Sequence, residues 1–399
     1  MRRRTDRAIH AFVLVIGALA SAALADLPPG YQVVPVTQNS YFERMSAINN
    51  RGQIVFSRRL VLSDNRTMEI FLYDHGVLTQ LTNDFVYDDH ASINDDGVIV
   101  WSRYSGPGET AEIAAWCDGA LSLLTSNAVD DMGPSINRWG HIAWQRRYLT
   151  GCASSESDIC FFDGSQISVV FSDGRSNQAP RLNDLDDIVW SRYNFCDSPW
   201  TSEVWMHSNG VSSRLTTDQF EAQTADINNQ RQVVWFYRTL PSYDDHLQIW
   251  EKGITTTVTD WGSGARINDR GEILFNRWYA DSQVWQLWLI REGRFFQLTN
   301  APYWNYWGDI NNRGEVVWSA GTPFDVDIRW LRRLDAGDLN CDGAVNVLDI
   351  DAFVLALLDA AAYAATYPHC DALLADFSGD GQANVLDIND FVAALGVVR

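Results

Sequence analysis

The sequence predicts an all-β fold, a seven-bladed β-propeller, joined to a small α-helical domain built on paired calcium-type loops. Two observations predict this organisation. A short motif of Ile, Asn, Gly and a Trp-containing apolar run recurs seven times between residues 26 and 334. Between residues 335 and 399, two loops share one spacing of Asp, Asn and Gly, and an amphipathic segment follows each.

Residues 1–25 precede both parts and have the pattern of a secretory signal. Four Arg lie among the first seven residues, an apolar run covers 8–19, and Ala23-Leu24-Ala25 forms a small-x-small cleavage site. The alternative is an uncleaved membrane anchor, but the run is short for a spanning helix, which favours cleavage. No later stretch is apolar enough to span a bilayer. We therefore expect a secreted protein, extracellular or attached to the cell surface.

The 399-residue chain has a formal net charge of −21. Because nucleic-acid phosphates need neutralising cations, this charge argues against a nucleic-acid partner. The length is sufficient for one large domain and one small one.

The propeller prediction rests on the motif Ile-Asn-x-x-Gly-x-Ile-Val-Trp. Its copies lie 40 to 46 residues apart, and every copy keeps the Asn. A period of this length, made of short β-rich runs, is typical of propeller blades. The seven copies begin at Ile48, Ile93, Ile136, Leu182, Ile227, Ile267 and Ile310.

The second copy shows the expected strand order. Residues 90–93 form the inner strand, and residues 94–97 form a tight turn, because Asn, Asp and Gly tolerate positive φ. The next strands are expected at 98–103, 112–117 and 121–125.

The seventh copy ends after its third strand, at residues 328–331. Residues 31–37, near the start of the chain, align with the fourth-strand segment 294–299 of the sixth copy. We therefore expect the N-terminal strand to complete the seventh copy and close the ring, which removes exposed sheet edges.

On these residues, the region 30–334 resembles the TolB-like propeller repeats, in which Pro-Asp-Gly precedes an Ile-Ala-Phe strand. It is also similar to secreted bacterial repeats with an Ile-Asn-x-x-Gly-x-Val-Val core. The resemblance implies an architecture and no particular activity, since propellers host many unrelated functions.

The loops opposite the Asn turns are long and variable, and such loops on a rigid scaffold usually carry binding sites. Acidic and aromatic residues gather there, namely Glu43, Asp88, Asp89, Asp130, Asp131, Glu221, Trp200, Trp261, Trp304 and Trp307. One interpretation is a glycan or cation site at the channel mouth, with Trp faces as stacking platforms.

The competing interpretation makes these acids inter-blade partners of the arginines that recur on the second strands. Those arginines are Arg58, Arg103, Arg146, Arg192 and Arg277. A residue repeated in every blade performs a repeated task, so recurrence favours the structural role. The repeated Trp101, Trp144, Trp190, Trp235 and Trp318 are likewise expected in the core between blades.

Common catalytic motifs are missing from the sequence, including Gly-x-Ser-x-Gly, His-Glu-x-x-His and a phosphate-binding Gly-rich loop. A pair of glycosidase carboxylates needs no fixed spacing and is not excluded. A binding or interaction module is therefore favoured over an enzyme. The alternative is a glycoside hydrolase or polysaccharide lyase with its site on the variable-loop face.

The two C-terminal loops, residues 338–349 and 376–387, carry oxygen side chains at loop positions 1, 3, 5, 9 and 12 and Gly at position 6. Calcium takes six to eight oxygen ligands, and the Gly permits a sharp turn around the ion. Apolar residues at helical spacing predict helices over 350–357 and 388–395. Because no amphipathic helix closely precedes either loop, the units are not ordinary helix–loop–helix hands.

These loops resemble those of the dockerins, paired calcium-loop modules that tether secreted proteins to cohesin domains. The family pattern Asp-x-Asn-x-Asp-Gly-x-x-Asn-x-x-Asp matches the first loop, and the second departs from it only at Ser378. The resemblance implies two calcium ions. The first ion would be held by Asp338, Asn340, Asp342, Asn346, Asp349 and the Ala344 carbonyl. The second would be held by Asp376, Ser378, Asp380, Asn384, Asp387 and the Gln382 carbonyl.

Dockerins recognise cohesins largely through loop positions 10 and 11 and the helix that follows. Here those positions are Val347-Leu348 and Val385-Leu386, more apolar than the Ser-Thr pairs common in cellulosomal dockerins. The resemblance implies a cohesin-bearing scaffold as partner and, by analogy, a role in polysaccharide breakdown.

Six cysteines are spread over both parts of the chain. Cys341 and Cys370 resemble those of the cysteine-containing dockerin variant, which implies a disulfide between them; the alternative is two free buried thiols, which export disfavours. Outside this module, Cys152 has either Cys160 or Cys196 as a candidate partner, and the sequence does not choose between them.

Overall fold

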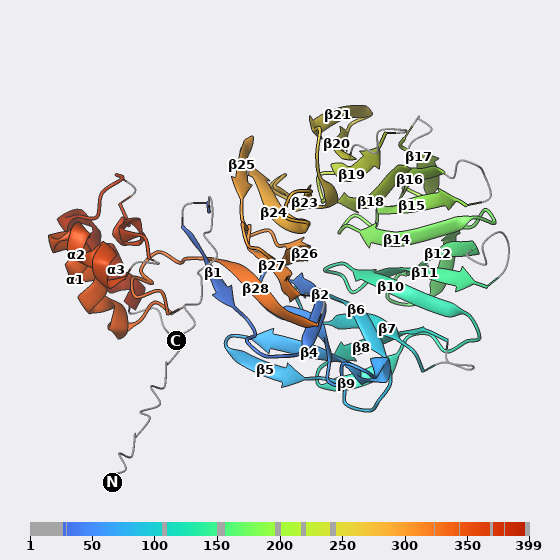
Figure 1. The fold of residues 1–399 in the computed structure, drawn as a ribbon, viewed down its shortest axis with the longest axis horizontal. Coiled ribbons are helices and arrows are strands. Elements are labelled where there is room, and N and C mark those ends of the chain that lie inside the picture. The colour runs from blue at the N-terminus through green and yellow to red at the C-terminus, as the bar shows by residue number, and fades with distance from the viewer. Residues whose placement is uncertain are drawn as a thin grey trace, which may run out of the picture.

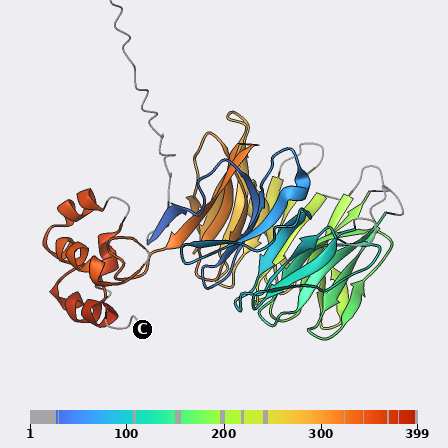
Figure 2. The same cartoon turned by 90° about the horizontal axis from the view of Figure 1, so that it is seen from below.

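The computed structural model describes residues 27–28, 30–105, 110–149, 156–195, 201–216, 221–239, 245–322, 324–342, 344–367, 370–378 and 380–395. Figures 1 and 2 show a large ring of β-strands and, beside β1 and β28, a small helical module formed by the C-terminal residues. The predicted signal peptide, residues 1–25, lies outside the described residues.

Among the described residues, antiparallel pairing divides the strands into seven groups of four, one for each copy of the motif. The first copy contains β2 (Phe42–Ile48), β3 (Ile54–Arg59), β4 (Met68–Asp74) and β5 (Val77–Gln80). The second contains β6 (Asp88–Ile93), β7 (Ile99–Arg103), β8 (Glu112–Cys117) and β9 (Ala120–Leu123). The third contains β10 (Asp130–Ile136), β11 (Ile142–Tyr148), β12 (Glu156–Phe162) and β13 (Ile167–Phe171).

The later copies follow the same order. The fourth contains β14 (Ser176–Leu182), β15 (Ile188–Asn194), β16 (Thr201–Ser208) and β17 (Val211–Arg214). The fifth contains β18 (Glu221–Ile227), β19 (Val233–Arg238), β20 (Asp245–Glu251) and β21 (Ile254–Thr259). The sixth contains β22 (Ser263–Ile267), β23 (Ile273–Tyr279), β24 (Val284–Arg291) and β25 (Arg294–Gln297).

The seventh copy combines strands from both ends of the ring. It contains β26 (Trp304–Ile310), β27 (Val316–Thr322), β28 (Asp325–Arg333) and, antiparallel to β28, β1 (Tyr31–Pro35). Thr37 Oγ1 accepts a hydrogen bond from Ile328 N at 2.9 Å, as Thr82 Oγ1 does from Ile70 N at 3.0 Å in the first copy. The predicted pairing of the N-terminal strand with the last copy is therefore present.

The core between the copies is formed by apolar residues of the second and third strands. The side chains of Trp101, Trp144, Trp190, Trp235 and Trp318 are fully buried there, as predicted. In the second copy, Trp101 Nε1 donates to Asp88 Oδ1 at 2.8 Å, and Trp190 Nε1 donates to Asn177 Oδ1 at 3.0 Å in the fourth. These two indoles thereby meet their hydrogen-bonding requirement inside the core, whereas Trp235 Nε1 has no partner among the described residues.

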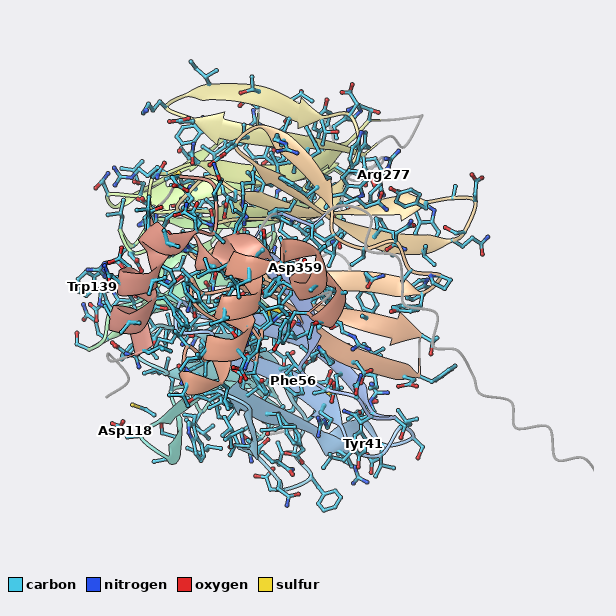
Figure 3. The ribbon with its side chains drawn as sticks, turned by 90° about the vertical axis from the view of Figure 1, so that its left-hand side faces the viewer. Tyr41, Phe56, Asp118, Trp139, Arg277 and Asp359 are labelled. Atoms are coloured by element: carbon cyan, nitrogen blue, oxygen red, sulfur yellow. A yellow bond between two sulfur atoms is a disulfide. The ribbon has the colours of Figure 1, made fainter. Side chains whose placement is uncertain are left out.

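The C-terminal module packs three helices around one apolar cluster. The helices are α1 (Ile350–Leu358), α2 (Ala360–Thr366) and α3 (Ile388–Leu395). The rings of Phe353 and Phe391 stack with centroids 3.9 Å apart. Helices α1 and α3 begin directly after the two loops, as predicted, whereas α2 was not predicted. Asp359 caps α2 and is labelled in Figure 3, which views the molecule from the side of this module.

Contacts of two arginines join the module to the propeller among the described residues. Arg332 Nη2 on β28 lies 3.3 Å from Asp338 Oδ2 in the first loop, and Arg313 Nη2 lies 3.3 Å from Asp335 Oδ1. No helix within the described residues has the length and apolar content needed to cross a membrane.

Candidate functional site

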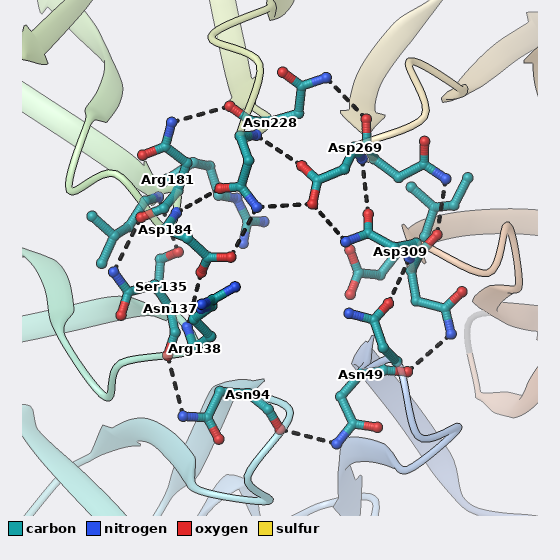
Figure 4. A pocket seen from close by; sticks show the side chains of 18 of the residues that line it. Asn49, Asn94, Ser135, Asn137, Arg138, Arg181, Asp184, Asn228, Asp269 and Asp309 are labelled. Atoms are coloured by element: carbon teal, nitrogen blue, oxygen red, sulfur yellow. Dashed lines mark hydrogen bonds between the residues drawn. The ribbon is translucent and has the colours of Figure 1, made fainter.

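The seven asparagines of the motif form a hydrogen-bonded ring around the axis of the propeller (Figure 4). Each Nδ2 donates to the backbone carbonyl of the next asparagine, at distances of 2.9 to 3.1 Å. The last of these bonds, from Asn311 to Asn49 O, joins the seventh copy to the first. Each Oδ1 also accepts two backbone N–H groups of its own turn; for Asn94 these belong to Asp96 and Val98. The ring members are Asn49, Asn94, Asn137, Asn183, Asn228, Asn268 and Asn311.

A second set of contacts links the residues that follow these asparagines. The backbone N–H of Asn229, for example, donates to Asp269 Oδ1 at 2.8 Å, and that of Asn312 donates to Asn50 Oδ1 at 2.7 Å. The second copy departs from this pattern. Its donor would be the backbone N–H of Asp95, and the residue at the acceptor position in the third copy is Arg138, whose side chain contains no hydrogen-bond acceptor. The motif asparagines therefore join neighbouring copies to one another. From the sequence, we predicted only that they form the tight turns.

Each inner strand carries a bulge three residues before the motif Ile or Leu, and the residue there has a positive φ. The bulges appear as register shifts in all seven copies among the described residues. The bulged residues are Met45, His90, Gly133, Ala179, Thr224, Gly264 and Trp307. Bulges of this kind redirect side chains, and non-glycine residues at positive φ carry strain that clusters at functional sites.

The residue directly before the motif Ile or Leu lines the channel and differs between the two halves of the ring. The first three copies place Ala47, Ser92 and Ser135 there. The other four place charged residues there, namely Arg181, Asp226, Arg266 and Asp309. The channel is therefore lined by small, uncharged side chains on one side and by charged side chains on the other.

The two acids of this set have a structural task. Asp226 Oδ2 accepts the N–H of Ile267 at 2.9 Å, and Asp309 Oδ2 accepts that of Ile48 at 3.1 Å, so each bonds to the next copy. Burial raises the pKa of the Asp309 carboxyl, although the nearby Arg266 guanidinium opposes this shift.

The two arginines do not share that task, because a guanidinium only donates. Arg266 Nη1 donates to the carbonyl of Ala265 at 2.9 Å. The Arg181 guanidinium makes no hydrogen bond or ion pair within the described part of the chain. Burial and the positive charge of Arg181 together lower the pKa of Arg266 to about 10, so this guanidinium remains charged at neutral pH.

A cavity of about 610 Å³ lies on the variable-loop side, between the fifth copy and the first. Its wall contains Trp304, Tyr306 and Trp307, whose neighbouring rings meet edge to face at centroid distances of 6.0 and 4.3 Å. Arg266 lines this aromatic cavity and also the cavity inside the channel. The remaining described residues of its wall are Phe42, Gln223, Thr224, Phe236, Arg238, Ser263, Gly264, Asn276, Trp285 and Gly308.

The aromatic cavity brings together two of the four tryptophans predicted for this face, Trp304 and Trp307. Trp261 instead packs inside the sixth copy, 5.4 Å from the Phe275 ring and under Arg277 at 4.2 Å. Trp200 lies outside the described residues. The acidic residues predicted for the face do not line this cavity among the residues described.

Three of those six acids, Glu43, Asp88 and Asp131, pair with the second-strand arginines, as the structural interpretation expected. Arg58 bonds Glu43 at 2.6 Å, and Arg146 bonds Asp131 at 2.8 Å. These pairs join the first two strands of one copy, so the expectation of inter-blade pairs was wrong for them. In each case the acid and the arginine lie directly opposite each other on two hydrogen-bonded strands of the same copy, so both side chains project from one side of that sheet.

The first C-terminal loop organises around Asp349, whose carboxylate is fully buried. Its Oδ1 accepts N–H groups of Leu339 and Asn340 at 2.8 and 3.0 Å, and its Oδ2 accepts that of Asn346 at 2.9 Å. The second loop repeats this with Asp387, which accepts from Ser378 and Asn384.

The remaining oxygens of the second loop converge. Asn384 Nδ2 donates to Asp380 Oδ2 at 3.0 Å and lies 3.3 Å from Gln382 O, so groups at loop positions 5, 7 and 9 meet at one point. Asp376 accepts the N–H groups of Asp380 and Gly381 at 3.1 and 2.8 Å. A convergent set of oxygens from carboxylates, an amide and a carbonyl is the donor set that calcium prefers, so these residues fit the ion.

Loop positions 10 and 11 are exposed in both loops. The exposed fractions are 69% for Val347, 65% for Leu348, 74% for Val385 and 65% for Leu386. Cys341 and Cys370 form the disulfide expected for this module. Cys160 is a free buried thiol, which removes it as a partner of Cys152; Cys152 and Cys196 lie outside the described residues.

No family model matches this chain, and no curated protein matches it. Among solved structures it is similar to the β-propeller domain of the Trilobed protease from Pyrococcus furiosus, with 13% identity, a TM-score of 0.56, and coverage of 75% of this chain and 96% of that one. An acylaminoacyl peptidase from Pyrococcus horikoshii is 13% identical at a TM-score of 0.54, over 75% of this chain. This chain spans only 53% of that peptidase.

TolB from Acinetobacter baumannii is also among the matches, with 12% identity, a TM-score of 0.44, and coverage of 71% of this chain and 64% of that one. The likeness to the two Pyrococcus propellers shows that the chain has a β-propeller fold. At these identities, it shows the fold alone.

Proposed function

We propose that this chain is an exported, seven-bladed propeller module that binds glycans in the aromatic cavity. A calcium-dependent, dockerin-like tether would hold it on a cohesin-bearing scaffold, in the service of polysaccharide breakdown. The propeller would bind the glycan, and the C-terminal module would attach the protein to the scaffold.

The observation that supports glycan binding is the composition of the aromatic cavity. Sugar rings stack on exposed aromatic faces, and Trp304, whose side chain is 38% exposed, presents such a face beside Trp307. Amide groups of Gln223 and Asn276 lie on the same wall and are suited to hydroxyl groups. Pockets that combine aromatic walls with a few polar groups are typical ligand sites.

The same wall supports binding over hydrolysis. Glycosidases use two carboxylic acids on either side of the scissile bond. No Asp or Glu lines the aromatic cavity within the described part of the chain. A polysaccharide panel separates the two functions, because new reducing ends or an ultraviolet-absorbing unsaturated product would identify a hydrolase or lyase.

Glycan binding is tested by affinity electrophoresis and calorimetry of the full chain against that panel. We expect Trp304→Ala and Trp307→Ala to weaken binding at least tenfold. Trp139→Ala is the matched control, because Trp139, labelled in Figure 3, is 57% exposed, lies in the turn of Asn137 and does not line the aromatic cavity. Equal losses in all three variants, or unchanged binding in the two cavity variants, would contradict this location of the site.

The tether is tested with cohesin domains and the full chain in calcium or in chelator. The exposed apolar pairs Val347-Leu348 and Val385-Leu386 support a role in partner binding. We expect cohesin binding in calcium, its loss in chelator, and its loss when both pairs are changed to Asp. Failure of every cohesin to bind in calcium would refute the tether.

A further inference from the structure

Two guanidinia line the channel beside the aromatic cavity, and one of them, Arg266, also lines that cavity. Arg266 lines the aromatic cavity, the cavity inside the channel, and the cavity at the Asn ring. Arg181 lines the latter two and affects Arg266 electrostatically. A ligand that lies along the aromatic wall therefore reaches Arg266 first and Arg181 behind it.

The repeat does not require arginine at either position. At the same position in other copies, Ser135 Oγ accepts the N–H of Leu182 at 3.2 Å, and Asp226 and Asp309 accept the corresponding N–H groups. An arginine side chain has no hydrogen-bond acceptor, so it does not accept the backbone N–H of the next copy. Within the described part of the chain, three of the seven copies make this contact, and of the four that do not, two place a cation in the channel.

The cations are also poorly satisfied by the protein. Of the five N–H donors that a guanidinium carries, Arg266 has one hydrogen bond, to Ala265 O. Neither arginine forms an ion pair with Asp226 or Asp309 among the described contacts. Two like charges in a partly buried channel repel each other, and an anion between them relieves that repulsion.

On the basis of the proposed glycan-binding function, we propose that this site selects acidic saccharides, with a sugar carboxylate held by Arg266 and Arg181 while adjacent rings stack on Trp304 and Trp307. A guanidinium binds a carboxylate through two parallel hydrogen bonds, which gives both affinity and orientation.

Asp226 and Asp309 limit the negative charge that a bound sugar can carry in this site. Asp226 and Asp309 place acidic side chains in the same channel, so a singly charged carboxylate is tolerated better than a doubly charged phosphate. The two Asp side chains also offer acceptors to the hydroxyl groups of the bound sugar. The site therefore favours uronic acids over phosphorylated sugars.

Calorimetry of the full chain with uronate oligosaccharides and their methyl esters tests the proposal, because each pair differs only in the carboxylate charge. The panel contains oligomers of galacturonate, mannuronate and glucuronate, with neutral cello- and xylo-oligomers. We expect at least one acid to bind about tenfold more tightly than its ester, a difference of about 1.4 kcal/mol.

The variants Arg266→Ser and Arg181→Ser reproduce the residue that the second and third copies carry at this position. We expect each to abolish the preference for the acid, measured as the ratio of acid to ester affinity in the same variant. Arg266→Lys retains the charge but loses the paired hydrogen bonds, so part of the preference remains. Asp226→Ser retains an acceptor for Ile267 N and removes a negative charge, so it maintains or increases the preference. Thermal unfolding curves confirm that each variant is folded.

The possible outcomes are distinct. Equal binding of acids and esters, or a preference that survives both Ser variants, overturns the proposal and leaves glycan binding intact. Tighter binding of a phosphorylated sugar than of any uronate also overturns it. Binding of no oligosaccharide refutes both this proposal and the proposed function.

Discussion

The propeller and the C-terminal module are both built from repeats, but they close in different ways. In the propeller, each motif asparagine donates to the next copy, and the bond from Asn311 to Asn49 completes the ring with protein atoms alone. In the module, the oxygens of each loop face one another, with an amide of Asn384 or Asn346 as their shared donor. The first arrangement is complete without a ligand, whereas the second has the donor set of a cation site.

Within the propeller, the repeated asparagine maintains the scaffold, and the binding that we propose lies where the repeat is broken. Asparagine is present in all seven copies at one position. One residue before the motif, by contrast, the side chains change from Ala and Ser to Arg and Asp. The binding site that we propose lies at this second position and along the aromatic wall above it.

The largest effect is expected from chelation. Removing calcium from the full chain should unfold α1 and α3, because binding of a structural ion is coupled to folding of its loops. Hydrogen exchange followed by mass spectrometry should show loss of protection within 335–395 and unchanged protection within 42–333.

The double variant Asp349→Ala with Asp387→Ala should reproduce the effect of chelation in the presence of calcium. Unchanged hydrogen-exchange protection of the module in chelator would show that the module, like the propeller, folds without calcium, and would contradict this prediction.

The ring is tested by Asn94→Ala. This change deletes the bond to Asn137 O and two bonds within the turn, and it leaves a buried carbonyl without its donor. We expect the propeller to lose about 4 kcal/mol of unfolding free energy in calcium and in chelator alike.

The control is Ser92→Ala, on the same inner strand, which gives the second copy the Ala that the first copy has at this position. Its expected effect is below about 0.5 kcal/mol. A loss for Asn94→Ala as small as that of the control would show that the ring contributes little to stability.

A pH-dependent effect is expected at Asp88. Burial raises the pKa of this carboxyl to about 7, although Arg103 and the indole of Trp101 oppose the shift. Because the folded-state pKa is above the unfolded one, the protonated carboxyl stabilises the fold at low pH, and that stability is lost as the pH rises. Between pH 4 and pH 7 the loss is about 3 kcal/mol.

Asp88→Asn isolates this contribution, since Asn occupies the same position in the fourth and seventh copies and accepts the indole N–H there. Denaturant titrations should show that the stability difference between the two proteins changes by about 3 kcal/mol over this pH range. Parallel pH profiles would show that Asp88 does not titrate as described.

The smallest effect distinguishes the two loops. Arg332 lies 3.3 Å from Asp338 in the first loop, and its charge competes with a cation there. The corresponding residue of the second loop, Asp376, bonds loop N–H groups instead. Arg332→Gln should therefore tighten calcium binding at one of two sites about fivefold, a change of about 1 kcal/mol. Calorimetry in which both sites change, or neither does, would contradict this asymmetry.

The sequence was sufficient for the parts of the fold that repeat. The period placed the strands, and the alignment of residues 31–37 with a fourth strand predicted the pairing of β1 with β28. The helices after the loops followed from apolar spacing. Helix α2 was missed because its Ala-rich residues 360–366 carry no amphipathic pattern, and its start depends on the cap provided by Asp359.

The site was only partly predictable. Aromatic residues on the variable face indicated Trp304 and Trp307, but Arg181 and Arg266 were overlooked, because their orientation depends on a bulge that alternation does not show. The sequence does contain a sign of these channel residues: the residue directly before the motif changes from copy to copy among Ala, Ser, Arg and Asp. The bonds between motif asparagines connect residues 40 or more positions apart, which the turn pattern alone does not reveal.

The most direct test of the account measures glycan and cohesin binding by the same full-length protein in calcium and in chelator. We expect glycan affinity to be unchanged by chelation and to fall at least tenfold in Trp304→Ala, whereas cohesin binding should be lost in chelator and unaffected by that variant. Glycan binding that disappears with calcium, or that is absent in both conditions, would contradict this expectation.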